Sequence, residues 1–124
     1  MAKKLLVTDP IGAFGMISLL KKSYEVNLTF CREDTEEEIS RGGYDGFFMT
    51  DLTVTSRIGR NELAAYENGL EIVKLASEKG LPTVVATGAS EEIRKKAENL
   101  GAKKVLEFPA DVDDVLAAFK EAGF

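Results

Sequence analysis

Three apolar residues and two polar ones form the stretch Phe47-Phe48-Met49-Thr50-Asp51, near the middle of the 124-residue chain. A short, uninterrupted apolar run is typical of a strand that is buried on both faces of a parallel sheet. The run stops at Thr50 and Asp51, so these two polar side chains are predicted at the carboxyl end of that strand. A buried parallel strand needs neighbours of the same kind, and the rest of the chain supplies them.

Four further segments are predicted to be strands, at residues 5–7, 24–30, 82–86 and 104–106. Residues 24–30 alternate between apolar and polar side chains, which is typical of a half-buried strand at a sheet edge. Apolar side chains at helical spacing predict a helix after each strand, with helices beginning near Ile11, Thr35, Leu70, Ser90 and Asp111. Thr35 and Glu38 form a capping box, and residues 52–68 have no regular pattern beyond a possible helical turn at 62–66.

This alternation predicts a single domain over residues 1–124, of the (βα)5 α/β class. Parallel strands joined by helical crossovers give a doubly wound sheet in a three-layer, flavodoxin-like sandwich. Because residues 24–30 are typical of an edge strand, the strand order 2-1-3-4-5 is favoured.

The composition excludes several kinds of function. The chain has no histidine and one cysteine, which rules out a catalytic triad, an imidazole base and zinc sites built from His or Cys clusters. A net charge of −5 argues against binding to nucleic acid. Asp9 and Pro10 interrupt the first apolar run, and no apolar stretch is long enough to span a membrane, so we expect a cytoplasmic protein.

Ligands of such sheets bind beyond the carboxyl ends of the strands, where Asp9, Asp51 and Thr87 are predicted. In the favoured strand order the two aspartates face each other. Neighbouring carboxylates repel each other, and Mg²⁺, which binds oxygen ligands, relieves the repulsion. A carboxylate nucleophile with Mg²⁺ could then support phosphoryl transfer. Either aspartate taken alone is also explained as a turn residue, but the three residues together favour a functional site.

The chain resembles the receiver domains of two-component response regulators over nearly its whole length. The resemblance rests on five segments, which are residues 5–9, 44–51, 69–71, 85–88 and 101–109. It implies that Asp51 is the phosphoacceptor and Thr87 the switch hydroxyl, and that Mg²⁺ is bound by Asp9, Asp51 and the backbone carbonyl of Thr53. It also implies a cis peptide bond before Pro109. The implied partners are a histidine kinase or phosphotransfer protein, which would carry the phosphodonor histidine, and a downstream protein target.

The chain departs from the family pattern at several positions. Thr8 stands where the family has a first acid, Phe108 where it has lysine, and Val105 where it has an aromatic residue. The segment 52–68 is longer than usual, since Asp51 and Gly69 are 18 positions apart (69 − 51). Two carboxylates and one Mg²⁺ still sum to zero charge (−2 + 2).

The missing lysine leaves open which group would contact a phosphoryl oxygen. Arg57 or Arg60 could supply that cation, but solvent-exposed loop arginines are the simpler interpretation. The leading hypothesis is an atypical, stand-alone receiver domain, a phosphoacceptor rather than a turnover enzyme. The alternative is a pseudo-receiver, an interaction module that is not phosphorylated. A small enzyme on the same fold has little support, because no acid–base set is present.

Overall fold

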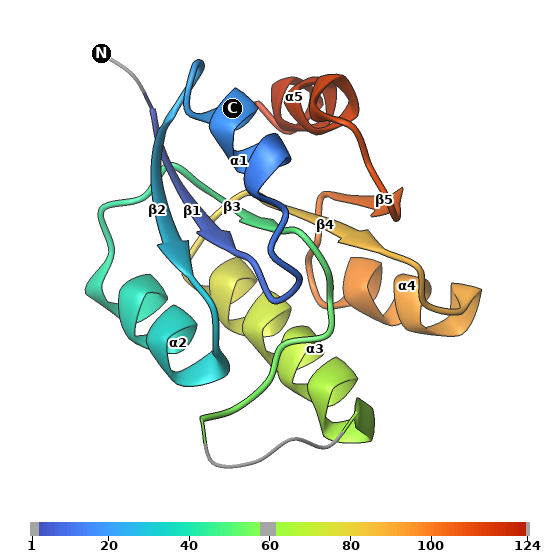
Figure 1. Cartoon of the computed structure of the whole chain (residues 1–124). Coiled ribbons are helices and arrows are strands. Elements are labelled where there is room, and N and C mark those ends of the chain that lie inside the picture. Colours follow the sequence, from blue (N-terminus) through green and yellow to red (C-terminus); the bar gives the residue numbers. More distant parts are fainter. Residues whose placement is uncertain (1–2, 58–61, 124) are drawn as a thin grey trace.

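Five parallel strands form one sheet with the order β2-β1-β3-β4-β5 (Figure 1). The computed structural model describes residues 3–57 and 62–123. The strands are β1 (Lys4–Thr8), β2 (Glu25–Thr29), β3 (Gly46–Met49), β4 (Thr83–Thr87) and β5 (Lys104–Glu107). The predicted doubly wound sheet and its strand order are confirmed, with β2 at the edge as its alternating pattern indicated.

Helices cover both faces of the sheet (Figure 1). Helices α1 (Phe14–Leu20) and α5 (Val112–Glu121) lie on one face, and α2 (Arg32–Arg41), α3 (Glu62–Glu78) and α4 (Glu91–Asn99) lie on the other. Alternate residues of β3 point into the two resulting cores, because successive side chains of a strand face opposite ways. Phe48 packs with α1 and α5, whereas Phe47 and Met49 pack with the other three helices.

Two helices begin earlier than the sequence pattern indicated. Helix α2 begins at Arg32 with Cys31 as its N-cap residue, so the prediction of a start at Thr35 is wrong. Thr35 is fully buried inside the helix, where its hydroxyl donates to the Cys31 carbonyl at 2.7 Å. Helix α3 begins at Glu62, so the irregular stretch predicted over 52–68 ends before that residue. Its first turns pack against the core through Ala65 and Tyr66.

The first helix is shorter than predicted, and fewer of its apolar side chains are buried. Helix α1 begins at Phe14 and buries Ile17 and Leu20, while Phe14 and Ile11 are exposed. The Phe108–Pro109 peptide bond is cis, as the family resemblance implied. In the described part of the chain, no helix is long and apolar enough to cross a membrane.

Candidate functional site

The carboxyl ends of β1 and β3 lie side by side and bring Asp9 close to Thr50. Thr8 is in register with Met49, and the Thr50 amide donates to the Thr8 carbonyl at 3.1 Å. Asp9 and Asp51 therefore follow two adjacent strands, as the predicted strand order requires. Thr87 ends the next strand, β4. We call this edge of the sheet the rim.

Asp9 is buried at the rim, and one of its two carboxylate oxygens accepts hydrogen bonds from the described residues. The side chain is 1% exposed. Its Oδ1 accepts hydrogen bonds from the Thr50 hydroxyl at 2.8 Å and from the Ala13 main-chain nitrogen at 3.0 Å. Its Oδ2 is buried and has no hydrogen-bond partner within the described residues. An ionised carboxylate is costly to bury without a partner, so this oxygen suits a bound cation.

Asp51 begins a segment that is anchored in the core at every second residue. Leu52 and Val54 are fully buried. Asp51, which precedes Leu52, and Thr53, which lies between the two, are partly exposed. Asp51 Oδ1 accepts a hydrogen bond from the Leu52 amide at 2.7 Å. No group of three or more acidic or cysteine side chains in the described residues could hold a metal ion. A metal at the rim would therefore depend on two carboxylates, backbone carbonyls and water, a donor set that suits Mg²⁺.

Thr87 lies at the rim, and its hydroxyl donates no hydrogen bond recorded among the residues that the structure describes. The side chain is fully buried, and its Oγ1 accepts a hydrogen bond from the Ala89 amide at 3.1 Å. Because a hydroxyl can accept and donate at once, this contact leaves its proton available to an anionic oxygen. The Thr87 carbonyl also accepts from the Phe108 amide at 3.1 Å, which connects the end of β4 to the segment after β5.

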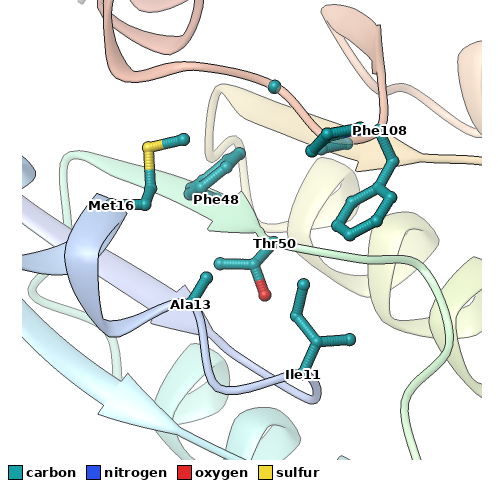
Figure 2. A pocket seen from close by; sticks show the side chains of 9 residues that line it. Ile11, Ala13, Met16, Phe48, Thr50 and Phe108 are labelled. Carbon is teal, nitrogen blue, oxygen red and sulfur yellow. The ribbon is translucent and has the colours of Figure 1, made fainter.

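An apolar cavity of about 170 Å³ lies beside the rim (Figure 2). It opens between α1, the ends of β3 and β4, and the connection from β5 to α5. None of the described residues that line it is charged; they are Ile11, Ala13, Met16, Phe48, Thr50, Ala86, Phe108, Pro109 and Ala110. The Phe108 ring therefore contributes apolar surface at the position where the resemblance would place a lysine.

Thr8, which stands where the resemblance would place a first acid, packs on the face of the sheet that α2 covers. It points to the same face of β1 as Leu6, and its hydroxyl lies 3.2 Å from that of Thr35 in α2. The Thr35 hydroxyl in turn lies 2.7 Å from that of Thr29 at the end of β2. Sequence analysis missed this buried threonine cluster. The alternation of β1 could have indicated it, because Thr8 and Asp9 must face opposite ways.

Of the two loop arginines proposed as the missing cation, the structure describes Arg57. The Arg57 guanidinium is exposed and is paired with Asp34 of α2. Arg60 lies outside the described residues. Sequence analysis did not foresee the partners of Arg57, because they come from an element 23 residues earlier in the chain.

Glu33, in the first turn of α2, should make the free energy of unfolding fall as the pH is lowered into the acid range. Hydrogen bonds from the Ser56 hydroxyl and the Arg57 amide lower the pKa of Glu33 from 4.5 to about 2. A lowered folded-state pKa stabilises the fold above the unfolded value, and the gain is lost as the pH falls through the folded value. The stability advantage of wild type over Glu33→Gln should thus be full above pH 4.5 and shrink as the pH falls to about 2.

Urea unfolding across that pH range measures this advantage. Glu37→Gln is the control, because Glu37 is paired with Arg41 inside the same helix. A wild-type advantage that stays constant down to pH 2 would contradict the prediction.

Comparison with known proteins identifies the fold. No protein-family model and no curated protein matches the sequence. Solved structures do match. A response regulator from Burkholderia pseudomallei, solved with a phosphorylated aspartic acid, a calcium ion and citrate, is 23% identical with a TM-score of 0.74, and the match covers 98% of this chain and 69% of that one.

Two further structures agree over nearly their whole length. A receiver domain (CheY-like) from Methylobacillus flagellatus is 21% identical with a TM-score of 0.72, covering 98% of this chain and 99% of that one. A LuxR-family DNA-binding response regulator from Staphylococcus aureus is 12% identical with a TM-score of 0.78, again covering 98% and 99%. The chain therefore has the fold of response-regulator receiver domains.

Proposed function

We propose that the chain is a receiver-type phosphoacceptor in phosphorelay signalling, with Asp51 as the residue that takes the phosphoryl group. The observation that carries the proposal is the buried Oδ2 of Asp9 at the same rim, which has no hydrogen-bond partner among the described residues. The neighbour from Burkholderia pseudomallei, whose structure holds a phosphorylated aspartic acid and a calcium ion, supports it by analogy. The proposed partners are a histidine kinase or phosphotransfer protein and a downstream protein.

The chain's own residues have separate roles in this proposal. Asp9, Asp51 and the Thr53 carbonyl would hold Mg²⁺, which when bound neutralises carboxylate and phosphoryl charge. An Asp51 carboxylate oxygen attacks phosphorus, and the bond from phosphorus to the donor imidazole nitrogen breaks. The Thr50 hydroxyl and the Ala13 amide keep Asp9 in place. The Thr87 hydroxyl donates its proton to a phosphoryl oxygen and so reports the modification.

One observation favours the pseudo-receiver alternative. Phe108 lines an apolar cavity beside the rim, and no charged residue contributes to the described lining. An unphosphorylated interaction module would have no need of a cation there. The two functions make opposite predictions for covalent labelling.

Incubation with acetyl phosphate and Mg²⁺ should add one phosphoryl group to the wild-type chain, seen as a hydroxylamine-sensitive increase in intact mass. Asp51→Asn should abolish the increase, because an amide cannot act as the nucleophile. Asp45→Asn is a matched control, since Asp45 lies before β3 and accepts from the Lys4 amide at 2.8 Å. Asp45→Asn should label like wild type. No labelling of wild type would favour the pseudo-receiver.

A further inference from the structure

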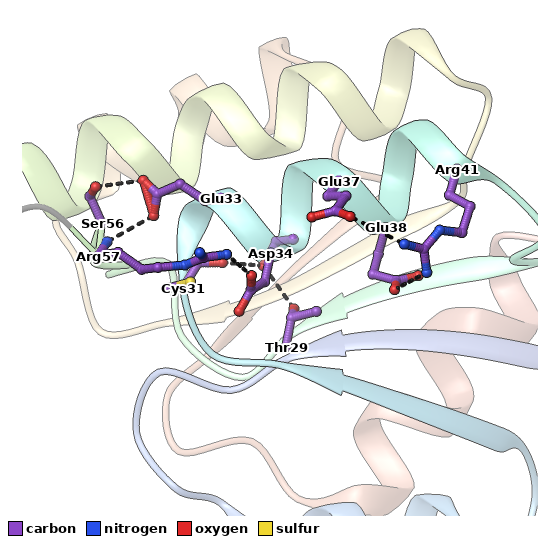
Figure 3. A network of polar contacts seen from close by, with 10 residues as sticks. Thr29, Cys31, Glu33, Asp34, Glu37, Glu38, Arg41, Ser56 and Arg57 are labelled. Carbon is purple, nitrogen blue, oxygen red and sulfur yellow. Dashed lines mark hydrogen bonds and ion pairs between the residues drawn. The ribbon is translucent and has the colours of Figure 1, made fainter.

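The first turn of α2 is joined to the segment after β3 by a group of polar contacts that we call the α2 clasp (Figure 3). The Glu33 carboxylate accepts from the Ser56 hydroxyl at 2.5 Å and from the Arg57 main-chain nitrogen at 2.8 Å. The Arg57 guanidinium pairs with Asp34 in the next position of the helix. Both oxygens of Glu33 are thus used to hold the chain at residues 56–57.

A second set of contacts holds the preceding residues. The Arg32 main-chain nitrogen donates to the Thr55 carbonyl at 2.9 Å. The Arg32 guanidinium donates to Asn68 Oδ1 of α3 at 2.6 Å, and Asn68 Nδ2 donates to the Val54 carbonyl at 3.0 Å. Backbone atoms of residues 54, 55 and 57 are therefore held by α2 or α3.

The clasp acts on the segment that carries the proposed ligands. Leu52 and Val54 anchor this segment in the core, Asn68 of α3 holds the Val54 carbonyl, and the clasp holds residues 56–57, the first of which lies three positions after Thr53. The rim offers two carboxylates among the described residues, so further donors to a metal would be backbone carbonyls or water. A backbone carbonyl keeps its direction better when the chain on both sides of it is held in place.

We propose that Glu33 is a positioning residue for the rim. By tying residues 56–57 to α2, its carboxylate fixes the orientation of the Thr53 carbonyl and limits the movement of Asp51. The inference rests on the proposed function, because it assumes that Mg²⁺ binds at Asp9, Asp51 and Thr53. It goes further by stating that Glu33, a residue outside the rim, influences the affinity of that site for Mg²⁺.

Three variants of exposed or half-buried helix positions test the role. Glu33→Ala removes both acceptors and should weaken Mg²⁺ binding about tenfold, the lower end of the effect of removing groups that orient metal ligands. Glu33→Gln keeps one acceptor oxygen and should lie between Glu33→Ala and wild type. Glu37→Ala changes a glutamate of the same helix that pairs with Arg41, and should bind Mg²⁺ like wild type. Mg²⁺ affinity is measured by isothermal titration of the whole chain.

Amide hydrogen exchange provides a readout that does not depend on Mg²⁺. Glu33→Ala should speed exchange at Arg57 and Val54, whose amides donate to Glu33 and to the Ala65 carbonyl. Unchanged exchange, or unchanged Mg²⁺ affinity in a chain that is labelled at Asp51, would overturn the positioning role alone. A wild-type chain that neither binds Mg²⁺ nor accepts a phosphoryl group overturns the proposed function, and the positioning role with it.

Discussion

Replacing Gly69 by alanine is expected to lower the free energy of unfolding by about 3 kcal/mol, the upper end of the usual cost of overpacking. Gly69 lies in α3 against the backbone of Leu52. A Cβ atom at Gly69 would lie 1.8 Å from the Leu52 carbonyl oxygen and 2.9 Å from its carbonyl carbon. Main-chain atoms cannot rotate away as the end of a side chain can, so the segment or the helix must move.

The same substitution should disturb the rim, because Leu52 directly follows Asp51. We expect Gly69→Ala to slow labelling of Asp51 as well as to shift the urea midpoint. Gly15→Ala is the matched control, since Gly15 is also helical and a Cβ there would have no neighbour within 4 Å. That control should leave stability unchanged or raise it by up to about 1 kcal/mol, because alanine favours helix over glycine. Equal shifts in the two variants would show that close packing at Gly69 is unimportant.

Mg²⁺ should stabilise the wild-type chain by about 2.7 kcal/mol at a free concentration one hundred times its dissociation constant. Asp9→Asn should remove most of this gain, because the buried Oδ2 of Asp9 is the proposed anionic ligand. Without Mg²⁺ wild type should lose its stability advantage over Asp9→Asn. The asparagine variant should then be at least as stable as wild type, because it no longer buries an unpaired charge.

Urea unfolding of both chains with and without Mg²⁺ measures the effect. Asp45→Asn again serves as the control and should retain the full Mg²⁺ gain, since Asp45 is exposed before β3. The same gain from Mg²⁺ in Asp9→Asn as in wild type would show that the ion binds elsewhere.

Much of the fold follows from local pattern. Short apolar runs such as Phe47-Phe48-Met49 identified the buried strands, and the alternation of residues 24–30 identified the edge strand and hence the strand order. The same reasoning placed Asp9, Asp51 and Thr87 at one edge of the sheet. Helix starts were less well predicted, because the capping preference of Thr35 was outweighed by its buried contacts with Thr29 and Thr8.

The sequence by itself determined the alternation of strands and helices, the side of the sheet at which polar residues gather, and the absence of histidine from the site. These properties depend on residues close together in the sequence and on the spacing of apolar residues, so the sequence alone indicates them. The tertiary structure alone decided that one oxygen of Asp9 has no partner among the described residues, that Thr8 packs against α2, and that Glu33 holds the segment after Asp51. Each of these depends on contacts between residues more than 20 positions apart, whose meeting is set by the packing of α2 and the strands together.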